Sequence, residues 1–145
     1  MFNRTVIILA FLVFLCGLTG CMTNSEKDKE ILNKKEVASI QLECTELCKQ
    51  KGTAPFSVKT FEYEKDIELF AKAINEGSEK MLGTVDYGAY FLMQINLKDG
   101  TQKKYVLNID KEFGTKGLLV ESSNSSQGYT ISQEFSFELS KIIYK

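Results

Sequence analysis

The chain has 145 residues, with 18 Lys or Arg, 19 Asp or Glu and a formal net charge of −1. This length predicts one domain, and the near-neutral charge argues against a nucleic-acid partner. The sequence contains neither histidine nor tryptophan. Because histidine is the commonest general base and a common metal ligand, its absence argues against zinc enzymes and Ser-His-Asp hydrolases.

The first segment of the chain has the pattern of a secretory signal. Residues 1–5 are short and carry one positive charge, Arg4, and residues 6–18 are almost entirely apolar. This stretch is shorter than the roughly 20 residues that a membrane-spanning helix needs, and its length suits a signal peptide. The alternative is an uncleaved N-terminal anchor, which requires the apolar segment to be counted through Met22.

The end of this segment favours a lipid attachment site. Leu18-Thr19-Gly20-Cys21 resembles the lipobox of bacterial lipoproteins, in which an aliphatic residue and two small residues precede a cysteine. The resemblance implies that the Cys21 thiol accepts a diacylglyceryl group and that a signal peptidase cleaves between Gly20 and Cys21. Two or more acyl chains, such as palmitate, give stable anchoring. We therefore expect a signal peptide over 1–20 and attachment to the outer face of the cell membrane.

After Cys21, polar residues predict a flexible tether over 21–35, followed by one domain over 36–145. Residues 37–44 alternate in the period of a half-buried strand, and residues 56–61 predict a second strand with Phe56 and Val58 on one face. Residues 62–77 change to the helical period, with Ile67, Phe70, Ala71 and Ile74 on one apolar face. Tyr63 gives this helix no side-chain cap.

The second half of the domain predicts a hairpin, one more strand and a final helix. Alternating residues flank Asp99-Gly100 over 90–110, which is a strong hairpin signal. Residues 117–122 predict a strand, and Ser132 is a suitable N-cap for a helix that continues to the C-terminus. The order ββαβββα predicts an α+β domain, with an antiparallel sheet of about five strands and two helices packed on one face.

Several short stretches resemble one family of small lipoproteins. These are the lipobox, "VASI" in the first strand, "AKAIN" at the end of the first helix, the central Tyr-Gly-Ala-Tyr-Phe-Leu, and "YTIS" with "ELSKII" near the C-terminus. Together they are similar to Gram-positive lipoproteins that carry a YhfM-like domain. The resemblance implies a compact extracytoplasmic α+β domain without established catalytic residues.

Two groups of residues are candidates for a site within the domain. Cys44 and Cys48 have a C-x3-C spacing, and outside the membrane such a pair is usually a disulfide. Two free thiols, or a thiol redox or copper(I) site, are the alternatives. The second group is Asp86, Tyr87 and Tyr90, in a glycine-containing loop over 83–90 that predicts a binding edge.

The sequence thus predicts a membrane-anchored extracytoplasmic lipoprotein that is not an enzyme and needs no cofactor or metal. It would bind or modulate an envelope protein or a small ligand, with the membrane as a second partner through Cys21. The alternative function is thiol redox or copper handling by Cys44 and Cys48. A structural or immunity-type role is a third hypothesis.

Overall fold

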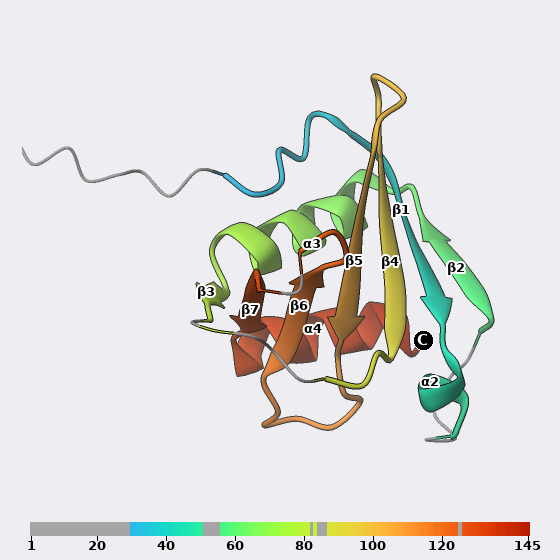
Figure 1. Cartoon of the computed structure of the whole chain (residues 1–145). Helices are drawn as coiled ribbons and strands as arrows, with labels where there is room; N and C mark the ends of the chain where they lie inside the picture. The colour runs from blue at the N-terminus through green and yellow to red at the C-terminus, as the bar shows by residue number, and fades with distance from the viewer. Residues whose placement is uncertain (1–29, 51–55, 82, 84–86, 125) are drawn as a thin grey trace, which may run out of the picture.

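The structure of the chain is a computed structural model that describes residues 30–50, 56–81, 83, 87–124 and 126–145. Within these residues, seven strands form one antiparallel sheet of order β2-β1-β4-β5-β6-β7-β3 (Figure 1). The strands are β1 (Val37–Cys44), β2 (Val58–Phe61), β3 (Ser78–Lys80), β4 (Phe91–Leu97), β5 (Gln102–Asn108), β6 (Gly117–Glu121) and β7 (Gly128–Ile131). The helices are α2 (Glu46–Gln50), α3 (Glu64–Asn75) and α4 (Gln133–Ile143).

The predicted α+β class with an antiparallel sheet is confirmed, but the predicted count of about five strands and two helices is wrong. The described residues contain seven strands and three helices, because β3, β7 and α2 were not expected. Each has five residues or fewer, so none is long enough to show a clear hydrophobic period. Their positions come from pairing with neighbours: β3 lies at one edge of the sheet, where it pairs with β7.

The hydrophobic core lies between one face of the sheet and the two long helices, α3 and α4, which are behind the sheet in Figure 1. The predicted apolar face of α3 is confirmed, since Ile67, Phe70, Ala71 and Ile74 are all buried. Phe70 meets Phe61 of β2 edge-to-face, with ring centroids 5.1 Å apart. This face of the sheet, called here the inner face, is covered. The opposite, outer face faces the viewer in Figure 1.

The central hairpin β4–β5 forms where the sequence predicts it. Phe91, Met93 and Ile95 point inward along β4, and each is at most 1% exposed. The turn needs glycine at one position, because Gly100 has a φ of +88°. Asp99 stabilises the same turn by accepting hydrogen bonds from the backbone N–H and the hydroxyl of Thr101. The register of the hairpin fixes which side chains point to the outer face.

Helix α4 begins with the predicted cap, as the Ser132 hydroxyl accepts a hydrogen bond from the backbone N–H of Phe135 at 3.4 Å. One turn later, Ser136 is buried among the core residues. Its hydroxyl accepts from the Gly117 N–H at 2.7 Å and donates to the Ile131 carbonyl at 3.3 Å. Because Gly117 and Ile131 are paired across β6 and β7, this one hydroxyl joins α4 to two strands.

The described chain packs onto the domain before residue 36, where the sequence predicts a tether. Leu32 is only 2% exposed and belongs to the hydrophobic core. Asn75, at the end of α3, accepts a hydrogen bond from the Leu32 N–H at 3.0 Å and donates one to the Leu32 carbonyl at 2.7 Å. Leu32 is therefore held firmly by the domain.

Candidate functional site

The outer face of the sheet is the candidate binding surface, because neither long helix covers it. One row of side chains crosses it from β2 to β6, and the register places Glu43 opposite both Val58 and Leu92. The row continues through Val106 and Val120, whose side chains are buried, so the exposed part of the row lies over β2, β1 and β4. Val58 and Leu92 are 50% and 45% exposed. Two large apolar side chains thus lie open to solvent on either side of one carboxylate.

A second row beside the first is polar. The register places Gln41 opposite Thr60 on one side and opposite Gln94 on the other, and Gln94 is in turn opposite Lys104. Along β4, the Gln94 amide donates to Asn96 at 2.9 Å. The outer face therefore changes from apolar to polar within two residues along each strand, as the alternation of strand side chains allows.

A hollow of about 190 Å³ lies between these two rows. Its walls are the outward side chains of the two rows and one residue beyond β6: Gln41, Glu43, Leu92, Gln94, Lys104 and Ser122. Met93 and Tyr105 also line it, but their side chains are buried, so they contribute main-chain atoms to its floor. The hollow thus combines an apolar group, two amides, a hydroxyl and two opposite charges.

Tyr105 connects the floor of the hollow with the core. Burial raises the pKa of the Tyr105 phenol above its usual value, and the nearby charges of Glu121 and Tyr129 raise it further. The neutral phenol is therefore the stable form over a wide pH range. It acts as a core side chain beneath the hollow rather than as a proton donor or acceptor within it.

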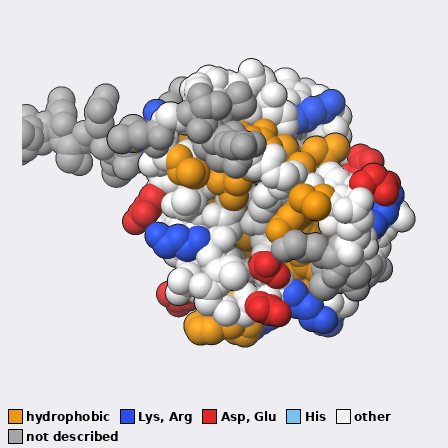
Figure 2. Space-filling model, turned by 60° about the horizontal axis from the view of Figure 1, so that its bottom comes forward, with side chains coloured by type: hydrophobic (Ala, Val, Ile, Leu, Met, Phe, Trp, Pro, Cys, Tyr) orange, Lys and Arg blue, Asp and Glu red, His pale blue; other side chains and the backbone are white. Residues whose placement is uncertain are grey.

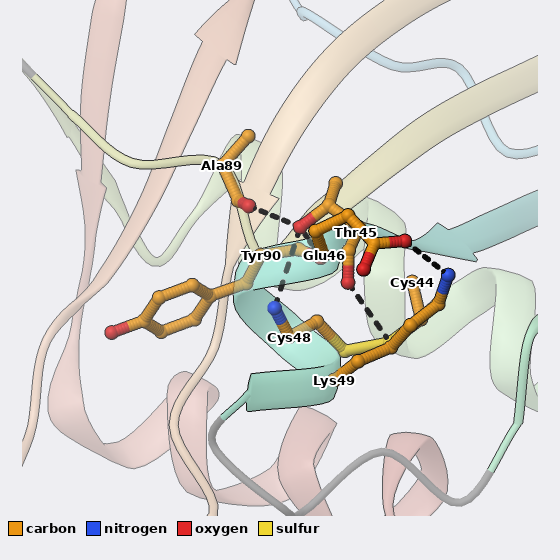
Figure 3. A network of polar contacts seen from close by, with 7 residues as sticks. All are labelled: Cys44, Thr45, Glu46, Cys48, Lys49, Ala89 and Tyr90. Atoms are coloured by element: carbon orange, nitrogen blue, oxygen red, sulfur yellow. Dashed lines mark hydrogen bonds and ion pairs between the residues drawn. A yellow bond between two sulfur atoms is a disulfide. The ribbon is translucent and has the colours of Figure 1, made fainter.

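Beside the hollow, Cys44 and Cys48 form a disulfide at the junction of β1 and α2 (Figure 3). Their Cα atoms are 5.5 Å apart, and each residue is 3% exposed. Helix α2 is too short to be stable alone. The disulfide, an ion pair of 2.6 Å between Lys49 and Glu46, and a cap at Thr45 hold it in place.

Thr45 joins this disulfide to the segment that precedes β4. Its hydroxyl donates to the Ala89 carbonyl, with the Tyr90 carbonyl 3.0 Å away, and accepts from the Cys48 N–H at 3.4 Å (Figure 3). The Thr45 N–H also donates to the Tyr90 carbonyl at 3.0 Å. The two groups that the sequence singles out separately, the cysteine pair and the 83–90 loop, therefore meet at one corner of the molecule.

From the other side, Asn108 holds the same segment. Its side chain accepts from the Tyr90 N–H at 2.8 Å and donates to the Gly88 carbonyl at 2.7 Å. Gly88 passes so close to Leu47 of α2 that an added Cβ would lie 2.6 Å from its methyl group. Tyr90 packs partly against the core, Tyr87 is half-buried, and Asp86 lies outside the described residues. This segment supports the corner, whereas the hollow lies one residue pair further along β1 and β4.

The remaining predicted site residues, Gly20 and Cys21, also lie outside the described residues. Within the part of the chain that the structure describes, no three His, Cys, Asp or Glu residues are placed to hold a metal ion. Nor does any helix described there combine the length and apolar character needed to cross a bilayer. Figure 2, in which the bottom of the Figure 1 view comes forward, shows several separate groups of hydrophobic side chains, with charged side chains mostly toward the rim.

The sequence prediction missed the hollow, although two signals for it are present. Outward positions in β4 carry Leu92 and Gln94, which alternate with the buried residues, and β5 carries the exposed Lys104. What the sequence alone does not give is the neighbour of these strands. Only the pairing of β1 with β4 brings Gln41 and Glu43 to the same place.

Comparisons with known proteins bear on the fold and not on the function. No family of proteins and no curated protein matches the chain. A crystal structure described as a thioesterase-like protein from Clostridium sporogenes has a similar fold, with a TM-score of 0.52 and 17% sequence identity. The similarity covers 75% of this chain and 94% of that chain. At this identity, the likeness shows that both chains share an α+β architecture.

Proposed function

We propose that the protein is a lipoprotein, anchored through Cys21 on the extracytoplasmic side of the cell membrane, whose outer sheet face binds an envelope protein or a small ligand. The observation that carries the binding role is the exposed part of this face, over β2, β1 and β4. Large apolar side chains there, Val58 and Leu92, are about half exposed beside a hollow, while helices cover the other face. Exposed apolar groups with polar neighbours are typical of binding surfaces.

The anchoring part of the proposal is supported by the leader, whose apolar stretch ends in Leu18-Thr19-Gly20-Cys21. The resemblance to lipoproteins with a YhfM-like domain is part of the same proposal. A Cys21→Ser variant should lose labelling by a palmitate analogue and should accumulate as unprocessed precursor. Normal labelling and anchoring of this variant would instead support an uncleaved helix.

The proposed role is binding without catalysis. The structural neighbour is described as thioesterase-like, so hydrolysis of thioesters is the activity to test first. This sequence has no histidine, the side chain that most often serves as general base, and Glu43, the carboxylate at the hollow, is exposed. We expect the protein to hydrolyse acyl-CoA substrates no faster than its Glu43→Gln variant does.

The alternative is a thiol redox or copper-handling role for Cys44 and Cys48. Copper(I) binding requires both sulfurs as thiolates, but they are bonded to one another and nearly inaccessible. Alkylation followed by mass spectrometry, with and without a reductant, tests this alternative. A pair that stays oxidised under mild reduction would exclude it, whereas ready reduction in the folded protein would favour it.

Site-specific crosslinking in intact cells tests the binding face. A photo-reactive residue at position 92 should capture a partner or a ligand, because Leu92 is exposed at the hollow. Position 63 provides the matched control, since Tyr63 is 80% exposed but lies at the start of α3 and not on the outer face. Equal products from both positions, or none from position 92, would contradict the proposed role of this face.

A further inference from the structure

Polar groups that no neighbour uses gather at the hollow. Within the described residues, Gln41, Glu43 and Lys104 make no side-chain hydrogen bond or ion pair, although all three line it. By contrast, Asn75 and Asn108 each bind two main-chain groups, and these bonds fix local structure. Gln41, Glu43 and Lys104 do not serve the fold in this way. They remain available to a ligand.

Two of these groups carry opposite charges at the two ends of the hollow. Glu43 is opposite Leu92 on β4, and Lys104 is opposite Gln94, two residues further along the same strand. Two strand spacings of about 4.8 Å, combined with two residues of about 3.4 Å each, separate their Cα atoms by about 12 Å. The two charges are thus too far apart to pair directly unless both side chains bend inward. A ligand between them can contact both.

The size and chemistry of the hollow limit which ligands it can bind. The hollow of about 190 Å³ is smaller than the roughly 300–1,000 Å³ pockets that hold drug-sized molecules. An extended peptide rises about 3.3–3.6 Å per residue, so two or three residues span about 7–11 Å between their charged ends. The amides of Gln41 and Gln94 both donate and accept hydrogen bonds, as a peptide group does. Leu92 offers an apolar contact for a ligand side chain.

We propose that the hollow binds di- or tripeptides with free ends. The peptide ammonium lies at Glu43, its carboxylate at Lys104, and its peptide groups at Gln41 and Gln94. This inference rests on the proposed function as a binding module and gives its ligand a chemical class. It makes no use of the disulfide or of the 87–90 segment, which support the neighbouring corner.

Titration of the full chain in detergent micelles, labelled with ¹⁵N at methionine and tyrosine only, tests the proposal. Addition of trialanine should shift the amide signals of Met93 and Tyr105 saturably, because their main chain forms the floor of the hollow. The amide of Tyr63, outside this face, should not move. Trialanine blocked at both ends should bind about tenfold more weakly, as each exposed ion pair contributes a few-fold. Equal affinity for the blocked peptide, no saturable shift, or tighter binding of an amino-sugar oligomer would overturn the proposal.

Charge-removing variants assign each end of the peptide. Glu43→Gln should weaken the binding of trialanine about three- to fivefold but leave the binding of N-acetylated trialanine unchanged. Lys104→Met should weaken the binding of trialanine by a similar factor but leave the binding of C-amidated trialanine unchanged. Exposed charges elsewhere provide the controls, Glu112→Gln and Lys98→Met, which should bind as the unmodified chain does. If Glu43→Gln weakens free and acetylated peptides equally, the assigned orientation is wrong.

The outcome is separable from that of the proposed function. Crosslinks from position 92 together with no peptide binding would overturn the ligand class and leave the binding face intact. Peptide binding by a chain that incorporates no lipid would overturn the anchoring and leave the hollow as a peptide site.

Discussion

The Ser136 hydroxyl gives the sharpest prediction for stability, because it satisfies a buried main-chain group that has a defined geometry. Ser136 is 2% exposed, and its oxygen lies 2.7 Å from the Gly117 nitrogen. In Ser136→Ala this N–H stays buried beside a methyl group, which costs about 1–3 kcal/mol. Alanine recovers about 0.5 kcal/mol through its higher helix propensity. The free energy of unfolding should therefore fall by about 0.5–2.5 kcal/mol.

Ser140, one turn further along α4, is the matched control. It is 5% exposed, and its hydroxyl donates to the Phe137 carbonyl of its own helix at 2.8 Å. Its removal leaves no buried N–H unpaired, so the lost bond and the gain in helix propensity should nearly cancel. Urea unfolding of the full chain in detergent measures both variants. Equal shifts of the two midpoints, or an unchanged midpoint for Ser136→Ala, would refute this account of the α4 contact.

Three further predictions follow from other contacts. Cys44→Ala with Cys48→Ala should lower the unfolding free energy by about 2 kcal/mol, because the closed loop is short. Reduction of the parent chain should cause a similar loss, and an unfolding free energy unchanged by reduction would contradict the bond. Above about pH 10 the unfolded chain ionises Tyr105 while burial keeps its pKa raised in the fold. Stability should therefore be full below pH 10 and fall as the pH rises further, and Tyr105→Phe should reduce this loss in alkaline unfolding curves. Leu32→Ala should cost about 2–5 kcal/mol in urea unfolding, and a change below 1 kcal/mol would show that Leu32 is not part of the core.

The sequence predicts the elements whose hydrophobic period extends over two turns or five strand residues. Helix α3 and the β4–β5 hairpin are such elements, and their apolar positions are buried as expected. Strand β3 has only three residues, and its place at the sheet edge depends on pairing with β7, about fifty residues later. The hydrophobic period of a short segment does not reveal a strand partner so far away in the sequence.

In the candidate site, too, the sequence predicts local features but not those that depend on pairing between distant strands. The binding edge expected at Tyr87 and Tyr90 stays a prediction, while Thr45 and Asn108 bind the main chain of Tyr90 beside the disulfide corner. The hollow was not expected, because its walls come from strands that lie about fifty residues apart in the chain. Val58 illustrates the reason: it was grouped with Phe56 on one face, yet it is half exposed, whereas Phe56 packs against the core.

The two hydrogen bonds between the Asn75 side chain and the Leu32 main chain limit how far the domain can move from its lipid in the anchored protein that we propose. Eleven residue steps separate Cys21 from Leu32, so the domain can rise at most about 40 Å from its lipid. The outer face would therefore meet only targets close to the bilayer surface. In the anchored protein that we propose, loss of the bonds between Asn75 and Leu32 would free more of the chain, so Leu32 would limit the reach of the domain as well as stabilise its fold.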